Sequence, residues 1–299
     1  MSTTAEDFHP ELKRLARVLP PAIVSRRTFP VMRRLTALAQ PGLPRGVGVQ
    51  RLPSGLRVRL HRPERALREG AALLWIHGGG YVMGSAAQDD RLCRRFAREL
   101  GVPVASADYR LAPEHPYPAA LEDCYETLTW LARQPGVDPE RIAIAGASAG
   151  GGLAAALALL ARDRGEIAPV FQLLVYPMVQ APAGQPQAES PGFRLWNHAA
   201  NRLGWQKYLS GADPAQVAPL RRPDLSGVAP AWIGVGTLDP LHDEDVAYAD
   251  RLAEAAVPCE LETVAGAFHG FDRIAPRAGV SVSFARRQRE ALSHAFARA

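Results

Sequence analysis

The stretch at residues 142–164 reads IAIAGASAGGGLAAALALLARDR and contains the most informative pattern in the chain. Its first four residues form a short apolar run, as in a buried strand, and glycine ends that run. The residues from Ala149 to Arg164 are rich in alanine and leucine, which favour a helix. The uncharged part is long enough to cross a bilayer, but it carries a serine and four glycines near its centre. A strand, a tight turn and a helix therefore explain the stretch better than a membrane span.

Strands and helices are predicted in alternation on both sides of this stretch. Strands at 47–51 and 56–60 flank Pro53-Ser54-Gly55, a turn signal typical of a hairpin. Further strands are predicted at 71–76, 102–107, 170–176, 231–236 and 259–264. Helices are predicted at 90–100, 119–131, 245–255 and 281–296. This alternation indicates an α/β fold with a mostly parallel sheet and helices on both faces.

Two segments interrupt the alternation. Residues 1–45 are predicted to form helical pieces broken by prolines, and residues 178–214 are rich in Pro, Gly, Gln and Ala. The catalytic core is expected to comprise residues 46–177 and 215–299, with the first segment as an appendage and the second as an insertion.

Composition and charge exclude several classes of protein. The chain has 299 residues, 47% of them hydrophobic and 22% charged, as is typical of a globular protein. Its formal net charge is +5, but the arginines are scattered and the only lysines are Lys13 and Lys207. Binding to nucleic acid requires basic charge focused on one face, so we expect no nucleic-acid partner.

The cysteines and the N-terminus favour an intracellular protein. Three cysteines, Cys93, Cys124 and Cys259, form neither an even disulfide framework nor a close metal-binding set. The N-terminal segment carries the acidic residues Glu6 and Asp7. It lacks the charged region followed by an apolar run that is typical of a signal peptide, so we expect no signal peptide. The expected location is the cytoplasm, with no membrane span.

The motif Gly146-Ala147-Ser148-Ala149-Gly150 fits the G-x-S-x-G nucleophile elbow. In such an elbow a serine projects from a sharp turn between strand and helix, and side chains at the glycine positions would collide with neighbouring chain. The alternative is a chance match in a helix rich in glycine and alanine. The predicted strand before the motif and the predicted helix after it favour the elbow.

A second glycine-rich run, His77-Gly78-Gly79-Gly80, follows the predicted strand at 71–76. Acyl transfer places negative charge on the former carbonyl oxygen, and backbone N–H groups must already point at it. We expect the oxyanion hole to comprise the N–H groups of Gly78, Gly79 and Ala149, with His77 anchoring the loop. The alternatives are an ordinary turn or a phosphate loop, but the run lacks the lysine and the spacing of known phosphate loops.

Asp239 and His269 each follow a predicted strand, so the chain order is Ser148, Asp239, His269. That order is the one expected for a catalytic triad on an α/β-hydrolase fold. Three acidic residues just beyond Asp239 suit the first turn of the next helix and compete weakly for the role of triad acid. They are Asp243, Glu244 and Asp245. His242 beside them suggests a metal ligand, but solvation of the helix start is the favoured interpretation, and we expect no metal site.

With these elements in order, the chain resembles the bacterial hormone-sensitive-lipase family of α/β-hydrolase esterases. The resemblance covers about residue 50 to the C-terminus and is weak in the insertion. The matching motifs are His77-Gly78-Gly79-Gly80-Tyr81 with Gly84, Asp108 to Glu114 with Pro118-Ala119-Ala120, Gly146 to Gly151, Asp239-Pro240-Leu241 with Asp243-Glu244, and His269-Gly270-Phe271. One departure is Ala147, where family members commonly carry Asp or Thr, and alanine removes a polar partner near the elbow without affecting the predicted triad.

The resemblance implies a carboxylesterase that hydrolyses short to medium acyl esters through a Ser-His-Asp triad and an acyl-enzyme, without metal or cofactor. It also implies a cap over the active site, built from residues 1–45 and 178–214. The expected partner is a small-molecule ester, and a homo-oligomer stays open. Four aromatic side chains are expected to line the substrate pocket, although a purely structural role is an equal alternative. They are Tyr81, Trp196, Trp205 and Tyr208.

Two other functions remain open at the level of sequence. The same triad can cleave an amide, a lactone or a carbamate, and a related scaffold can serve as a non-catalytic ligand-binding protein. Such binding proteins lose a triad member, whereas Ser148, Asp239 and His269 are all present here.

Overall fold

The computed structural model describes residues 8–38 and 46–298, and its centre is an eight-stranded sheet. The strands are ordered β1-β2-β4-β3-β5-β6-β7-β8. Their bounds are β1 (Val47–Arg51), β2 (Arg57–His61), β3 (Gly70–Ile76), β4 (Val104–Ala107), β5 (Val137–Ala147), β6 (Phe171–Val175), β7 (Ala231–Leu238) and β8 (Cys259–Phe268). The β1–β2 and β2–β4 pairs are antiparallel, and every other neighbouring pair is parallel. The expected α/β fold with a mostly parallel sheet is confirmed.

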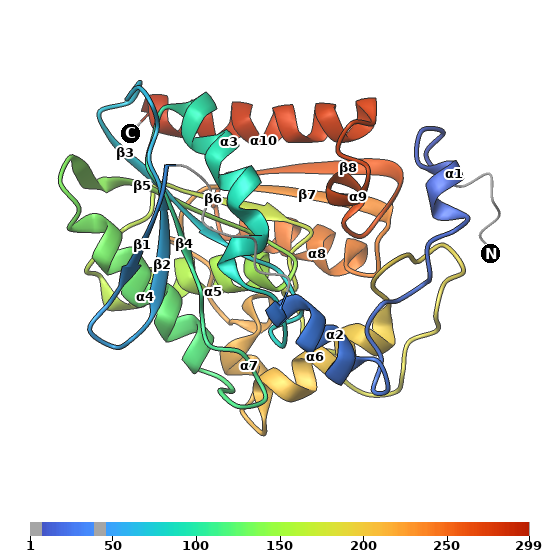
Figure 1. Ribbon diagram of the computed structural model, residues 1–299. Helices are drawn as coiled ribbons and strands as arrows, with labels where there is room; N and C mark the ends of the chain where they lie inside the picture. The colour runs from blue at the N-terminus through green and yellow to red at the C-terminus, as the bar shows by residue number, and fades with distance from the viewer. Residues whose placement is uncertain (1–7, 39–45, 299) are drawn as a thin grey trace.

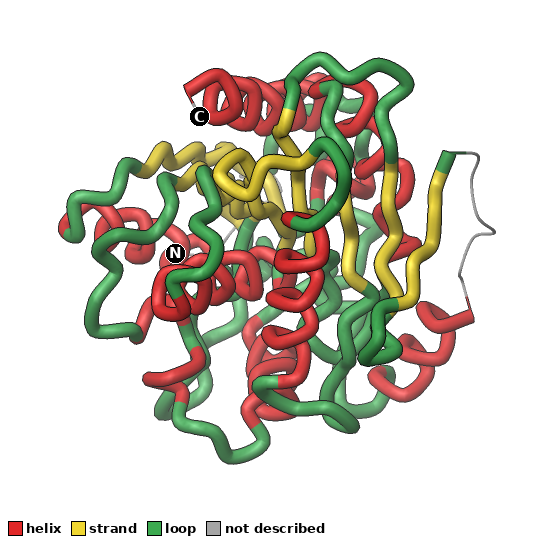
Figure 2. Tube along the Cα trace, turned by 90° about the vertical axis from the view of Figure 1, so that its left-hand side faces the viewer, coloured by secondary structure: helices red, strands yellow, loops and turns green. Residues whose placement is uncertain are grey.

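Helices cover both faces of the sheet (Figures 1 and 2). The longer ones are α2 (Phe29–Leu38), α3 (Asp90–Leu100), α4 (Ala119–Ala132), α5 (Ala149–Arg164), α6 (His198–Leu209), α8 (His242–Glu254) and α10 (Gly279–Arg298). The short ones are α1 (Lys13–Ala16), α7 (Pro214–Val217) and α9 (Phe271–Ile274), with 3-10 turns η1 (Ala86–Asp89) and η2 (Pro219–Arg221). One apolar core forms on the face covered by α4, α5 and α8, and a second forms under α3 and α10.

Burial on both faces explains why the central strands are apolar throughout. In β3 every residue after Gly70 is buried, and β4 is buried along its whole length. Side chains alternate between the two cores, so Leu74 packs under the α4–α5 layer while Leu73 and Trp75 pack under α3 and α10. A strand buried on both faces needs a continuous apolar run. The strand at 71–76 was predicted from such a run.

All eight predicted strands and the hairpin at Pro53 are present, and the largest difference in extent is in β5. Strand β5 begins at Val137, which pairs with Gly70, and not at residue 142 as predicted, because polar residues such as Asp138 and Glu140 break the apolar pattern in its first part. Helix α6 lies inside the insertion, where no apolar periodicity predicted a helix. It begins with a side-chain cap, since the Asn197 side chain accepts a hydrogen bond from the Ala200 amide at 2.9 Å.

The N-terminal segment and the insertion contact each other. The Leu195 N–H donates to the Pro20 carbonyl at 2.9 Å, and the Ile23 N–H donates to the Leu195 carbonyl at 3.0 Å. The Lys207 ammonium on α6 lies 5.9 Å from the centre of the Phe29 ring on α2, and Figure 1 shows these two helices side by side. Residues 1–7 and 39–45 of the predicted N-terminal cap lie outside the described residues, and the division into cap and core stays a prediction.

The uncharged stretch from Ile142 to Ala161 divides between β5 and α5. Across residues 8–38 and 46–298, no helix combines the length and the apolar character needed to cross a membrane.

We predict that Phe284→Ala on α10 lowers the free energy of unfolding by about 3–5 kcal/mol, because it leaves a cavity in the core. Phe284 is 1% exposed, and its ring lies 5.4 Å from that of Trp232 and 5.1 Å from that of Phe271. The matched control is Val282→Ala, two residues away on the same helix but 53% exposed, which should change stability by less than about 0.5 kcal/mol. Equal urea denaturation midpoints for the two variants would contradict this packing.

Candidate active site

Ser148 occupies a sharp turn between β5 and α5 with a strained backbone, at φ 56° and ψ −123°. A Cβ on Gly146 would lie 2.2 Å from the Gly150 carbonyl oxygen, and one on Gly150 would lie 2.1 Å from the Ile76 carbonyl oxygen. Neither glycine therefore tolerates a side chain. The Ser148 N–H donates to the Val175 carbonyl at 2.9 Å, which ties the turn to the end of β6.

Three side chains far apart in the sequence form one hydrogen-bonded line. The Ser148 Oγ lies 3.1 Å from His269 Nε2, and His269 Nδ1 lies 2.8 Å from Asp239 Oδ2. The other carboxylate oxygen of Asp239 accepts a hydrogen bond from the Leu241 N–H at 2.9 Å, which fixes the carboxylate. Nδ1 of the imidazole faces the carboxylate and Nε2 faces the serine hydroxyl, so a proton on Nδ1 would leave Nε2 as a hydrogen-bond acceptor.

The line is shielded from water. Ser148, Asp239 and His269 are 7%, 3% and 8% exposed. The rings of Tyr176 and Trp196 lie 4.7 Å and 6.2 Å from the imidazole of His269. Low local polarity strengthens electrostatic interactions within such a line.

Sequence reasoning missed Tyr176, which ends the strand predicted at 170–176. Its ring packs on His269, and its hydroxyl donates to Asp272 Oδ1 at 2.8 Å. Burial raises the pKa of Tyr176 well above its usual range, so this hydroxyl stays protonated and acts as a donor. The available signal was its position at the carboxyl end of a parallel strand, beside the strand that leads to Ser148.

The loop at residues 77–80 lies against Ser148. A Cβ on Gly78 would be 2.8 Å from the Ala147 carbonyl oxygen and 3.3 Å from Ser148 Cβ. In the described part of the chain, no hydrogen bond uses the N–H group of Gly78 or Gly79. Ala149 is the first residue of α5, where N–H groups have no acceptor within the helix. Gly78 and Ala149 thus lie beside the serine, Gly79 follows Gly78 in the same loop, and the N–H groups of all three have no hydrogen-bond acceptor among the described residues.

Buried side chains hold this loop in place. The His77 ring stacks on Tyr109 at 4.2 Å, its Nδ1 lies 2.8 Å from the Gly78 carbonyl oxygen, and the Tyr109 hydroxyl donates to the His77 carbonyl at 2.9 Å. Gln88, which sequence reasoning missed, donates from Nε2 to the Gly78 carbonyl at 3.2 Å. Burial lowers the pKa of His77, which keeps the ring neutral and fits the predicted anchoring role.

The four predicted pocket residues fall into two groups. Tyr81, Trp205 and Tyr208 form one buried cluster, in which the Tyr81 ring stacks on Tyr208 at 4.2 Å and lies 5.0 Å from Trp205. Trp196 lies apart from it, over Gly80 and near His269, and within the described residues its indole Nε1 has no hydrogen-bond partner. Trp196 is therefore the member of the set that lies nearest the imidazole.

The three acidic residues after Asp239 have separate environments. Asp243 is exposed in the first turn of α8, as predicted, with His242 Nδ1 2.9 Å from its carboxylate. Glu244 instead accepts hydrogen bonds from the N–H groups of Val179 and Gln180, at 2.9 and 3.1 Å. Asp245 is fully buried. Among the residues that the structure describes, no three His, Cys, Asp or Glu side chains gather as around a metal ion.

Comparison with known proteins gives the family. A family model described as the alpha/beta hydrolase fold matches residues 73–273, which is more than half of the chain. The chain belongs to this family. Within it, this α/β hydrolase belongs to the hormone-sensitive-lipase-like branch, as the motifs at residues 77–84 and 146–151 predicted.

Several relatives of this α/β hydrolase are esterases by name. Esterase LipI of Mycobacterium tuberculosis is 42% identical over 217 residues, which are 70% of this chain and 67% of that protein. An ethyl acetate hydrolase of Pseudomonas putida is 40% identical over 233 residues, 73% of this chain and 72% of that protein. The crystal structure of esterase LipW from Mycobacterium marinum superposes with a TM-score of 0.85 at 33% identity, covering 99% of this chain and 98% of that one.

We predict that Glu244→Gln removes part of the pH dependence of stability. Burial raises the pKa of Glu244 to about 8 from an ordinary value of 4.5, so the protonated form is favoured in the folded state. Its contribution to stability is present below about pH 4.5 and is lost as the pH rises through about 8. Glutamine keeps the acceptor for Val179 and Gln180 but cannot ionise.

The thermal midpoint of the wild type should therefore fall relative to that of Glu244→Gln as the pH rises across this interval. The control is Asp243→Asn, which alters the exposed neighbour in the same helical turn. Parallel pH profiles for wild type and Glu244→Gln would contradict the prediction.

Proposed function

We propose that this carboxylic-ester hydrolase cleaves short to medium acyl esters with Ser148 as nucleophile, His269 as general base and Asp239 as the residue that orients the base. The Oγ–Nε2 contact of 3.1 Å between Ser148 and His269 is the observation that carries the proposal. It is within hydrogen-bond reach for proton transfer, and the base is held in turn by a carboxylate.

The reaction begins when Ser148 Oγ attacks the ester carbonyl and His269 Nε2 takes the hydroxyl proton. Asp239 stabilises the imidazolium without accepting a proton itself. The N–H groups of Gly78, Gly79 and Ala149 bind the oxyanion of the tetrahedral intermediate. His269 then returns the proton to the leaving alcohol, which departs and leaves an acyl group on Ser148.

Hydrolysis of the acyl-enzyme repeats these steps with water as the nucleophile. His269 removes a proton from the water, the oxyanion forms again at the same amides, and Ser148 leaves with the proton from His269. The chain's own side chains and amides provide every proton transfer and the charge stabilisation, so the proposed reaction needs no cofactor.

The range of esters is inferred from the relatives and from the walls of the site. One relative is named for a two-carbon acyl ester, ethyl acetate. The indole of Trp196 lies against the backbone of Gly80, beside the proposed oxyanion loop, and near His269. We infer that Trp196 contacts the acyl or alcohol group, whereas Tyr81, Trp205 and Tyr208 form the more distant wall.

Ser148→Ala should abolish turnover of p-nitrophenyl butyrate while leaving the fold intact, because no other group on this line can form the acyl-enzyme. The measurement is the steady-state rate, with circular dichroism to verify the fold. An organophosphonate should modify the wild type at residue 148 and leave Ser148→Ala unmodified, as located by mass spectrometry. Wild-type turnover by the variant would refute the assignment, and faster cleavage of a matched p-nitroanilide than of the ester would favour an amidase.

Trp196→Ala should change the preference among p-nitrophenyl acetate, butyrate and octanoate, since it removes a wall next to the imidazole. We expect kcat/KM for octanoate to rise relative to acetate by about tenfold, the effect typical of one or two methylene groups in an apolar pocket. The matched control is Trp205→Ala, which removes the same side chain from the more distant cluster. A chain-length preference unchanged by Trp196→Ala would exclude Trp196 from the pocket.

A further inference from the structure

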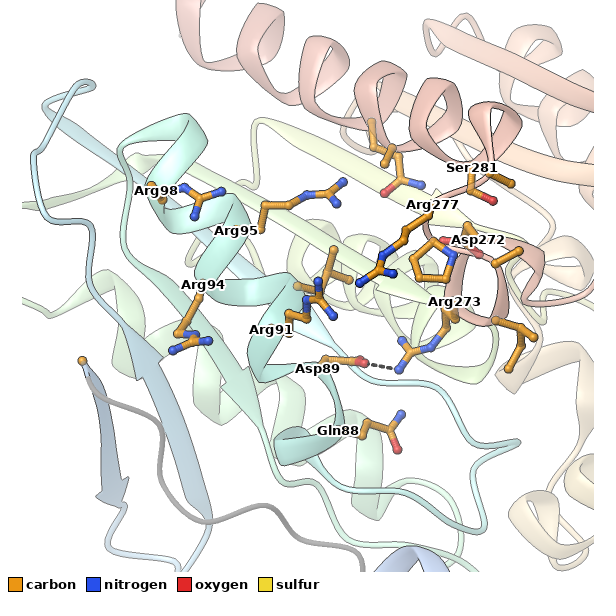
Figure 3. A pocket seen from close by; sticks show the side chains of 18 of the residues that line it. Gln88, Asp89, Arg91, Arg94, Arg95, Arg98, Asp272, Arg273, Arg277 and Ser281 are labelled. Carbon is orange, nitrogen blue, oxygen red and sulfur yellow. Dashed lines mark ion pairs between the residues drawn. The ribbon is translucent and has the colours of Figure 1, made fainter.

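A cavity of about 1080 Å³ lies between α3 and the segment that runs from α9 into α10, and the proposed reaction does not use it. Figure 3 shows this cavity from close by. Its volume is at the upper end of the range for small-molecule sites. The triad residues do not line it, although it shares Gln88 with the loop at residues 77–80.

Arginines dominate the walls of the cavity. Seven arginines line it against three carboxylates, and four of the arginines belong to α3. These four are Arg91, Arg94, Arg95 and Arg98, which span eight residues of the helix, or about 10 Å along its axis. Figure 3 shows Arg91, Arg95 and Arg277 extending into the space between α3 and the segment leading to α10.

Most of this positive charge is not neutralised by the protein. Of the three carboxylates, Asp89 pairs with Arg273 at 2.5 Å, and Asp272 accepts a hydrogen bond from Tyr176. Among the described residues, Arg91, Arg94 and Arg277 form no ion pair. Arg95 and Arg98 share a single carboxylate, that of Glu99, which also pairs with a third arginine. The cavity therefore carries an excess of guanidinium groups over carboxylates.

Two buried polar groups in the same wall lack partners. Ser281 and Gln288 on α10 are 2% and 3% exposed, and both line the cavity. Within residues 8–38 and 46–298, neither Ser281 Oγ nor Gln288 Nε2 has a hydrogen-bond partner. A buried polar group without a partner costs stability, and each of these two atoms can donate to an acceptor oxygen.

We propose that this cavity binds a small molecule that carries an oligophosphate group, either free or attached to an organic part. Guanidinium groups match phosphate oxygens with paired hydrogen bonds, and a row of about 10 Å suits several linked phosphates rather than one. Ser281 and Gln288 complete the site as neutral donors. A concave wall with buried donors favours a small ligand over an extended surface partner.

The first test measures binding of inorganic tripolyphosphate to the full chain by isothermal titration calorimetry. Tripolyphosphate should bind at least about tenfold more tightly than orthophosphate, because it reaches several guanidinium groups at once. A parallel titration with ATP separates the two sources of the ligand, since tighter binding of ATP would indicate that the organic part also contacts the cavity. Absence of tripolyphosphate binding at millimolar concentration, or equal affinity for orthophosphate, would overturn the proposal.

The second test distinguishes a specific binding site from the general electrostatic attraction of an anion to a chain of net charge +5. The triple variant Arg91→Gln, Arg95→Gln, Arg277→Gln should weaken tripolyphosphate binding by about tenfold or more and leave ester hydrolysis unchanged. The matched control replaces three exposed arginines outside the cavity, Arg26→Gln, Arg27→Gln, Arg133→Gln, which removes the same charge. Equal losses of affinity in the two variants would refute a specific site.

The third test addresses the buried donors. Ser281→Ala should weaken tripolyphosphate binding several-fold without lowering the thermal midpoint of the free protein, because the hydroxyl it removes has no partner in the described residues. Wild-type affinity in this variant would mean that only surface charge attracts the anion, and the proposed site would be wrong.

Discussion

The strained backbone at Ser148 is the constraint on which the rest of the site depends. A non-glycine residue at positive φ costs about 1–3 kcal/mol and persists only where the surroundings enforce it. Here β5, α5 and the hydrogen bond to Val175 enforce it, and Gly146 and Gly150 allow the neighbouring chain to approach within about 2 Å of where a Cβ would be. The turn directs the Ser148 hydroxyl toward His269. It also brings Gly78 close to the backbone of Ala147, the residue before the serine.

Sheet topology explains how the other groups reach this turn. β3, β5, β6, β7 and β8 are neighbouring parallel strands, so the segments that follow them emerge at one edge of the sheet. The glycine loop, Ser148, Tyr176, Asp239 and His269 each follow one of those strands. Hydrogen bonds from the buried Tyr109 and from Gln88 then hold the glycine loop at that edge, so the loop is already ordered before the reaction begins.

The arginine-lined cavity lies close to the candidate active site but is separate from it. Helix α9 follows His269 directly, and Asp272 on it joins the hydroxyl of Tyr176, whose ring packs on the imidazole. Gln88 touches both the cavity and the Gly78 carbonyl. A ligand in the cavity would therefore contact elements that also position the oxyanion loop and the base.

The order of strands and helices, the elbow at Ser148, and the positions of Asp239 and His269 after strand ends could all be predicted from the sequence. These features are local, because apolar runs, glycine positions and strand-end polar residues are written in consecutive residues. The sequence did not predict the helix at His198–Leu209, the contacts of Glu244 with the Val179 and Gln180 amides, or the roles of Tyr176 and Gln88. These features depend on which segments, distant in the sequence, contact each other in the folded chain. The fold alone places Trp196 near the imidazole and Trp205 in another cluster, and it brings the arginines of α3 to the same cavity as Arg273 and Arg277. Side-chain neighbours of this kind are set by packing and not by spacing in the sequence.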